Sequence, residues 1–243
     1  MMADKSDDLY LRVEKAVAQY WNTRFGQAKK QKSGGRQDQG SRGAVTGGAQ
    51  MDGFVSLIAD LIVEAGVDEK HIFCKNALEL PGFFRPTKEW DLLVVKEGQL
   101  LIALEAKSQV GPSFGNNFNN RTEEAMGSAL DLWTAYREGA FNETIRPWLG
   151  YIFMLEDSPR SQSPIRVKEP HFEVFPEFKH ASYSKRYELF CRKLMRERHY
   201  DAACLLTSKR TTGANGRFKE PAKDLTFRLF TDSIKGQIFS YGN

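Results

Sequence analysis

Apolar side chains recur along much of the chain at intervals of three and four residues, which is the spacing of one face of a helix. In residues 7–24 this stripe contains Leu9, Val13 and Trp21, and in residues 51–65 it stops at Gly66, a typical helix end. Asn120, followed three residues later by Glu123, resembles a helix start with its capping box. The helices predicted from this period cover residues 7–24, 51–65, 120–136 and 182–198.

Continuous apolar runs of strand length form the second pattern. Residues 90–95 and 100–104 are two such runs, and Lys96-Glu97-Gly98-Gln99 between them indicates a hairpin turn. Further strands are predicted at residues 148–155, 202–207 and 225–230. Together the two patterns predict one α/β or α+β domain over residues 1–243, with a central mixed β-sheet flanked by helices.

Polar segments rich in glycine or asparagine separate these elements. Residues 29–50 are basic and glycine-rich, carry too little apolar surface to pack, and are predicted to form a long loop. Residues 109–120 and 209–221 are expected to be shorter loops.

Composition describes an ordinary soluble protein of 243 residues, 41% hydrophobic and 27% charged. No apolar stretch has the length of a membrane span, and residues 1–8 do not resemble a signal peptide. Cys74, Cys191 and Cys204 form no metal-binding or disulfide pattern, so we expect no membrane partner and a cytoplasmic location.

The net charge is only +4, but its distribution is uneven. Basic residues gather in residues 24–42, 185–198 and 209–223, whereas residues 51–84 are acidic. Three basic runs in one chain favour a polyanionic partner such as a nucleic acid. Any single run could equally be a solvated surface.

One pattern of charged residues stands out by its surroundings. An acid followed ten to twenty residues later by Asp/Glu-x-Lys occurs three times, but only Asp91 with Glu105 and Lys107 lies on predicted strands. Charges at the end of a buried hairpin are costly unless they are paired or bind a metal. Glu105 and Lys107 also share one strand face, because side chains alternate along a strand.

Two carboxylates and one amine in this arrangement suit magnesium-assisted hydrolysis of a phosphodiester. Mg²⁺ prefers oxygen ligands, which Asp91, Glu105 and the backbone carbonyl of Ala106 could supply, with Glu64 as a further candidate from the preceding helix. Lys107 would face the attacking water or the developing negative charge. The alternative is a structural Glu105–Lys107 ion pair that binds no metal.

Two other segments contain residues that can act as nucleophiles. Gly111-Pro112-Ser113-Phe114-Gly115 matches the GxSxG elbow of serine hydrolases, but that elbow enters a helix directly, whereas a polar loop is expected here. Cys204 lies in an apolar run without a histidine motif nearby and is expected in the core.

Asp91, Glu105-Ala106-Lys107 and their strands resemble the core of the PD-(D/E)xK nuclease superfamily, although Trp90 stands where that motif often has proline. The run from Leu104 through Gly139 resembles more specifically the XhoI family of type II restriction endonucleases. This resemblance implies a Mg²⁺-dependent homodimer that cuts both strands of double-stranded DNA at a palindrome, typically 5′-CTCGAG. It also implies a cognate DNA methyltransferase as functional partner, without a required contact.

Arginine reads guanine in the major groove, and asparagine or glutamine reads adenine. Candidate DNA-binding residues of these types, or basic residues beside them, are Arg36, Arg42, Gln50, Asn116, Asn117, Asn120, Arg121, Lys209, Arg210, Asn215 and Arg217. Two alternatives stay open: a related nuclease that acts on junctions or damaged ends, and a DNA-binding protein without catalysis.

Overall fold

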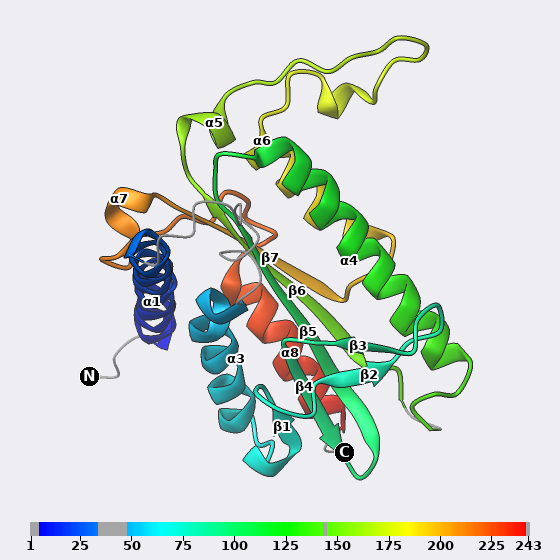
Figure 1. Ribbon diagram of the computed structural model, residues 1–243. Helices are drawn as coiled ribbons and strands as arrows, with labels where there is room; N and C mark the ends of the chain where they lie inside the picture. The colour runs from blue at the N-terminus through cyan, green and yellow to red at the C-terminus, as the bar shows by residue number, and fades with distance from the viewer. Residues whose placement is uncertain (1–4, 34–47, 143–144, 242–243) are drawn as a thin grey trace.

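The computed structural model describes residues 5–33, 48–142 and 145–241 (Figure 1). Its centre is a five-stranded sheet in the order β1-β4-β5-β6-β7. β1, β4 and β5 are antiparallel, whereas β5, β6 and β7 run parallel. The strands are β1 (Ile72–Phe73), β4 (Leu92–Lys96), β5 (Gln99–Gln109), β6 (Trp148–Glu156) and β7 (Ala202–Ser208). The predicted mixed sheet is therefore confirmed.

The predicted hairpin joins β4 to β5. Glu97 and Gly98 form its turn with φ angles of 53° and 75°, so both turn residues adopt the left-handed conformation typical of tight hairpins. The pairing with β4 ends at Leu92↔Leu104, but β5 continues to Gln109. The last part of β5 therefore has β6 on one edge and no paired strand on the other.

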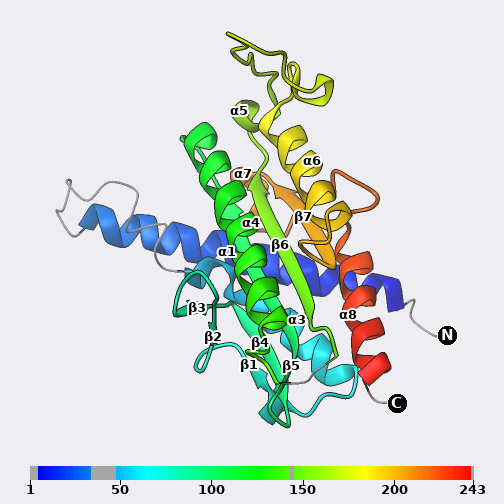
Figure 2. The same ribbon diagram turned by 90° about the vertical axis from the view of Figure 1, so that its right-hand side faces the viewer.

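Helices cover both faces of the sheet (Figures 1 and 2). One apolar core joins the sheet to α1 (Lys5–Ser33), α3 (Asp52–Glu64) and α8 (Phe227–Tyr241). A second core joins the other face to α4 (Phe114–Arg137) and α6 (Tyr183–Arg196). Within the described residues, no helix is long and apolar enough to cross a membrane.

A small hairpin crosses from the central sheet to α4. It consists of β2 (Glu79–Pro81) and β3 (Thr87–Glu89), which pair antiparallel as a separate sheet. The remaining described elements are single turns: η1 (Gly48–Met51), η2 (Glu69–His71), α5 (Pro159–Gln162), η3 (Pro176–Phe178) and α7 (Arg210–Gly213).

Two predicted boundaries and one predicted strand were wrong. Helix α1 continues to Ser33 and η1 begins at Gly48, so both ends of the expected 29–50 loop are helical; residues 34–47 lie outside the described part. Helix α4 begins at Phe114 rather than after Asn120, because its asparagines lie mostly on the solvent side of a regular helix. The predicted strand 225–230 is mostly the start of α8, where Phe227, Phe230 and Ile234 are buried at helical spacing.

Candidate active site

The two strands of the main hairpin bring Asp91, Glu105 and Lys107 to one place. Asp91 directly precedes β4, and its backbone N–H donates to the carbonyl of Leu104 at 3.1 Å. Glu105 and Lys107 follow on β5, on the face of the sheet that α4 covers. The Tyr200 hydroxyl shows this, since it contacts both the Glu105 carboxylate and the Ala125 carbonyl of α4. Asp91 therefore stands beside the part of β5 that β4 no longer pairs.

The lysine amine joins the two carboxylates. Lys107 Nζ lies 3.0 Å from Asp91 Oδ2 and 3.4 Å from Glu105 Oε1. The side chain of Glu105 is 3% exposed, whereas those of Asp91 and Lys107 are 30% and 24% exposed. The two carboxylates thus converge on a point that already holds a cation, and that point is accessible from solvent on the Asp91 side.

Sequence reasoning missed two further members of this group. Lys88 on β3 places Nζ 3.3 Å from Glu105 Oε1 and 3.8 Å from the centre of the Trp90 ring. Tyr200, in the turn before β7, donates its hydroxyl to Glu105 Oε2 at 2.7 Å. Neither residue belongs to a recognisable motif, since a lysine in a three-residue strand and a tyrosine between elements give no periodic signal.

Burial and charge act in opposite directions on these groups. Burial tends to raise the pKa of Glu105, but Lys107 and Lys88 outweigh it and the pKa is lowered. Burial tends to lower the pKa of Lys107, but Glu105 and Asp91 outweigh it and the pKa is raised. For Lys88 burial prevails, and its pKa is lowered despite Glu105. The folded protein thus favours the charged forms of Glu105 and Lys107.

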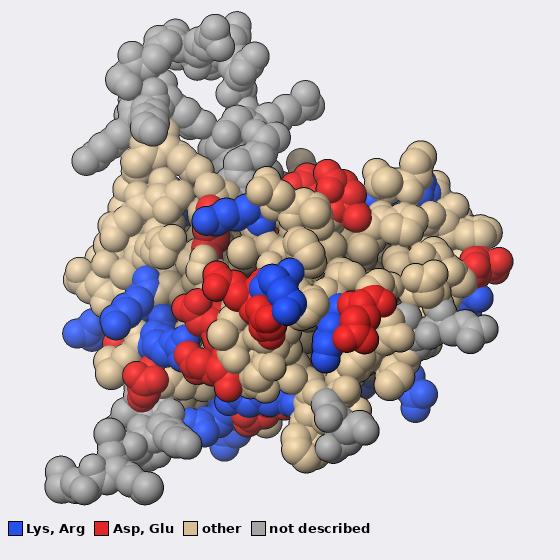
Figure 3. Space-filling model, turned by 90° about the horizontal axis from the view of Figure 1, so that it is seen from below, with Lys and Arg blue, Asp and Glu red and all other residues tan. Residues whose placement is uncertain are grey.

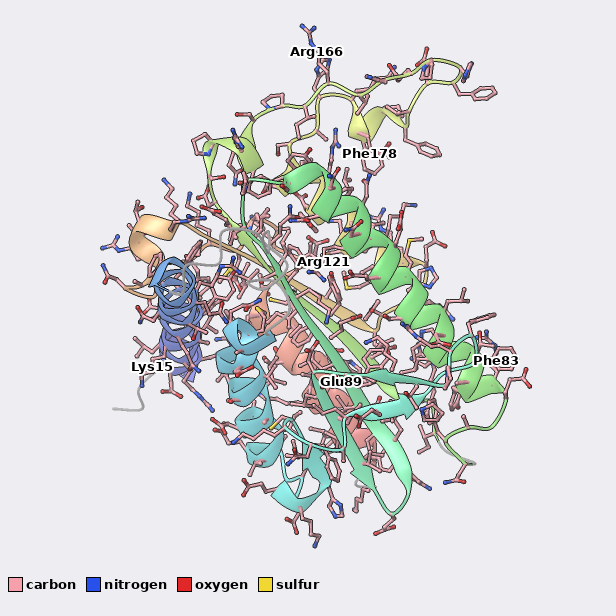
Figure 4. All side chains as sticks on the ribbon, viewed as in Figure 1. Lys15, Phe83, Glu89, Arg121, Arg166 and Phe178 are labelled. Atoms are coloured by element: carbon pink, nitrogen blue, oxygen red, sulfur yellow. The ribbon has the colours of Figure 1, made fainter. Side chains whose placement is uncertain are left out.

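Two grooves meet at this group. One, of about 700 Å³, runs toward α4 and is lined by Lys88, Glu105 and Arg121. The other, of about 500 Å³, is lined by Asp91 together with Asp52 from the first turn of α3. Lys107 lines both grooves, and so does Glu89, which lies near the middle of the molecule in Figure 4.

The donors beside Lys107 are of the type that a hard divalent cation prefers. Ala106 N–H donates to Asp91 Oδ2 at 2.8 Å. The N–H and C=O of one strand residue point to the same edge, so the Ala106 carbonyl also lies on the edge of β5 that β4 leaves free. Across the described residues, no three His, Cys, Asp or Glu side chains form a metal-binding group, so a bound ion would use two carboxylates, this carbonyl and further oxygens.

Glu64 is not part of this group. It ends α3, and its carboxylate lies 2.8 Å from the guanidinium of Arg12 on α1, beside a different cavity. The acid that α3 brings near Asp91 is Asp52, whose pKa is raised by burial and by the charge of Asp91. The predicted acid, Glu64, thus lies at the end of α3 opposite to Asp52.

The candidate DNA-binding residues fall into separate groups. Lys209, Arg210, Asn215 and Arg217 are exposed around α7, directly after β7. Because β5, β6 and β7 are parallel, this segment lies at the same edge of the sheet as the end of β5. Arg210 also pairs with Glu156 at 3.2 Å.

The remaining candidates are more scattered. Asn116, Asn117, Asn120 and Arg121 occupy the first turns of α4 rather than a loop, and Arg121 contacts Glu124. Gln50 is 7% exposed. Arg36 and Arg42 lie outside the described residues.

The GxSxG segment has a geometry that the sequence did not predict. Ser113 directly precedes α4, so a helix does follow the motif. The described residues that line the cavity around it are Pro112, Ser113, Phe114, Gly115, Asn116, Pro159, Arg160, Ser163 and Tyr183. None of them is a histidine or an acid that could activate the serine. Cys204 is fully buried as expected, and burial raises the pKa of its thiol well above the ordinary value.

A mixed sheet carries an acid, a buried glutamate and a lysine in contact on its central hairpin, as the resemblance to nucleases predicts. The family model of restriction endonuclease XhoI matches residues 30–220. The chain therefore belongs to the XhoI family of type II restriction endonucleases, which are site-specific deoxyribonucleases.

Named relatives are similar over most of their length. The type II restriction enzyme BstVI of Geobacillus stearothermophilus is 55% identical over 210 residues, which cover 84% of this chain and 93% of that protein. The type II restriction enzyme XhoI of Xanthomonas vasicola is 46% identical over 181 residues, covering 74% and 72%. The type II restriction enzyme AbrI of Azospirillum brasilense is 49% identical over 172 residues, covering 70% and 77%. No solved structure matches the chain.

Proposed function

We propose that this chain is a Mg²⁺-dependent endonuclease that cleaves both strands of double-stranded DNA at a palindromic site, 5′-CTCGAG. The observation that carries this proposal is the convergence of Asp91 and Glu105 on the amine of Lys107. The family supports hydrolysis of DNA, and the oxygen donors beside Lys107 support a hard divalent cation as cofactor.

Each residue of the group has a distinct role in this reaction. Asp91, Glu105 and the Ala106 carbonyl would hold the ion, which when bound supplies a polarised phosphate and a more acidic water. Lys107 contacts both carboxylates, so it is placed to orient the attacking water and to stabilise negative charge on the phosphate. Tyr200 and Lys88 fix Glu105 from two sides, which limits the motion of the buried carboxylate.

The charge distribution favours DNA binding away from the lower face of the molecule. Figure 3 shows this face from below, with acidic and basic side chains side by side over its centre. Such a mixture attracts a polyanion less than a run of one sign does. The exposed basic residues Lys209, Arg210 and Arg217 lie at the other end of the parallel strands, and they support approach of DNA from there.

A palindromic site is matched by a two-fold symmetric protein, so we infer that a homodimer binds it. A cognate DNA methyltransferase that modifies the same site would protect the host without contacting this protein. We place this activity in the cytoplasm, consistent with the free thiols of Cys74, Cys191 and Cys204.

The direct test is digestion of plasmid DNA that contains one 5′-CTCGAG site, with Mg²⁺ and with EDTA. We expect one linear product only with Mg²⁺, and sequencing its ends gives both the site and the cut positions. Discrete cleavage at another sequence would change only the proposed recognition sequence and leave the rest of the proposal intact. Nicking at junctions or damaged ends would replace the proposal with a repair nuclease, and binding without cleavage would replace it with a binding protein.

Asp91→Ala tests the catalytic group itself. The variant loses one of two carboxylates at the metal position, so we expect cleavage to fall by at least about a hundredfold. Asp60→Ala, which removes an exposed acid from α3, serves as the control with normal cleavage. Circular dichroism must show the same fold for both variants, and activity retained by Asp91→Ala would exclude Asp91 from the site.

A further inference from the structure

Four large apolar side chains are exposed at the groove that runs from Glu105 and Lys107 toward α4. Phe83 and Phe84 at the tip of the β2–β3 hairpin are 53% and 67% exposed, and Met126 and Leu130 on α4 are 45% and 48% exposed. Met126 and Leu130 share one helix face because they are four residues apart. Phe84 and Leu130 line the same groove, and the rings of Phe83 and Phe84 are 5.3 Å apart. We call these four residues the α4 patch.

The exposed position of the two phenylalanines is fixed by hydrogen bonds. The Asp131 side chain, 4% exposed, accepts the backbone N–H of Phe83 at 2.7 Å and that of Phe84 at 2.8 Å. It also accepts Arg85 Nε at 2.6 Å. A buried carboxylate on α4 thus holds the hairpin tip with both rings outside the core, which is a preorganised contact surface. Figure 4 shows Phe83 at the outer edge of the molecule beside α4.

The charges along α4 indicate what covers this patch. Glu123, Met126, Leu130 and Arg137 follow one another on the exposed face of the helix, at spacings of three, four and seven residues. All four are exposed, and Figure 2 shows α4 on the viewer's side of the sheet. Glu123 and Arg137 are equally far from Leu130 in sequence, about 10 Å to either side along the helix.

We propose that the α4 patch is the interface between two copies of this chain, with the two α4 helices packed antiparallel about Leu130. In that arrangement Glu123 of each copy faces Arg137 of the partner subunit, so the same surface is complementary to itself, as a two-fold contact requires. The inference rests on the proposed function for the need of a dimer. This contact covers the groove that Phe84 and Leu130 share with Glu105 and Lys107. The groove that contains Asp91 and Lys107 has no α4 residue among its described lining, so it stays open, and DNA would reach the catalytic group from that side.

Charge reversal tests the pairing directly. In the Glu123→Arg variant, two arginines face each other at both symmetric contacts. In the Arg137→Glu variant, two glutamates face each other at both contacts. We expect either variant to raise the dimer dissociation constant about tenfold or more, measured by sedimentation equilibrium of the full chain. The double variant restores opposite charges, and we expect its dissociation constant to return close to the wild-type value.

An exposed apolar side chain on another element provides the control. Phe239 on α8 is 75% exposed. Phe239→Ser should leave the dimer unchanged, whereas a monomeric Phe239→Ser variant would assign the interface to α8 instead. Circular dichroism of all variants separates lost pairing from lost folding.

Three outcomes would overturn the inference: a monomeric wild-type chain, dimers that both single charge reversals leave intact, or a monomeric Phe239→Ser variant. None of them depends on cleavage. A wild-type chain that forms this dimer but does not cut DNA would contradict the proposed function and support the interface. A chain that cuts DNA while both single charge-reversal variants remain dimeric would contradict the interface and support the proposed function.

Discussion

The hydroxyl of Tyr200 is the uncharged donor that holds Glu105. It is buried, and it lies 2.7 Å from Glu105 Oε2 and 3.1 Å from the carbonyl of Ala125. Tyr200→Phe leaves the ring in place but removes the donor to a buried carboxylate. We expect the free energy of unfolding to fall by about 1–3 kcal/mol, measured by denaturant titration. We also expect half-maximal cleavage to need more Mg²⁺, since the carboxylate is less well oriented.

A purely structural role for Tyr200 would lower stability without changing the Mg²⁺ requirement. Tyr10→Phe is a suitable comparison, because the Tyr10 hydroxyl also donates to a carboxylate, that of Glu220 at 3.1 Å, but on α1 and outside the described lining of both grooves. It should leave the Mg²⁺ requirement as it is.

Lys88 adds a second cation to the two carboxylates. With Lys88 and Lys107 against Asp91 and Glu105, the charges of the group balance, whereas metal sites usually carry excess negative charge. Lys88→Met keeps an apolar stem against Trp90 and removes one positive charge. We therefore expect tighter binding of Mn²⁺ to the free protein, several-fold by calorimetry.

The control for Lys88 is Lys75→Met in the neighbouring groove. Lys75 is exposed, so water screens its charge and the change in Mn²⁺ affinity should be small. Unchanged or weaker Mn²⁺ binding by Lys88→Met would show that Lys88 supports the site by holding Glu105 rather than by opposing the ion.

Among the elements, the β2–β3 hairpin depends on one buried carboxylate. Burial acts to raise the pKa of Asp131, but hydrogen bonds from Phe84, Arg85 and Phe83 outweigh it and the pKa is lowered. A carboxyl group with a lowered folded pKa stabilises the fold above its unfolded pKa of about 3.9, and this contribution is lost as the pH falls through the folded pKa. Asp131→Asn should therefore be less stable than the wild type at pH 7, and the gap should narrow below pH 4.

Denaturant unfolding at both pH values measures this gap. Asp60→Asn on the exposed side of α3 should show no comparable pH dependence, because its side chain is 69% exposed. A gap that stays constant with pH would mean that Asp131 acts by shape rather than by charge.

The elements also show how far sequence reasoning reached. The β4–β5 hairpin could be predicted because apolar runs and a Glu-Gly turn are local signals. The hairpin in turn predicted that Asp91, Glu105 and Lys107 lie close together. The start of α8 was mistaken for a strand, since a short apolar run fits both periods until Ile234 is included. Lys88, Tyr200 and Asp52 reach the site from β3, from the turn before β7 and from the start of α3. Such contacts depend on tertiary packing, which no local pattern records.

At the scale of the whole molecule, the contacts of the candidate catalytic group form within one chain. Lys107 contacts Asp91 and Glu105, and Lys88 and Tyr200 also contact Glu105. None of these contacts needs a residue from a second copy. In the proposed homodimer each copy would therefore cut one strand.

A mixed dimer of wild-type and Lys107→Ala chains, isolated with two different affinity tags, should convert a supercoiled plasmid with one site to the nicked circle. Linear DNA would appear only slowly, because it needs a second binding event in the opposite orientation. Agarose gels follow both products, and wild-type dimers that carry the same two tags should give linear DNA directly. Mixed dimers that cut neither strand would show instead that the two copies share catalytic groups, because a single inactive chain would then disable both sites.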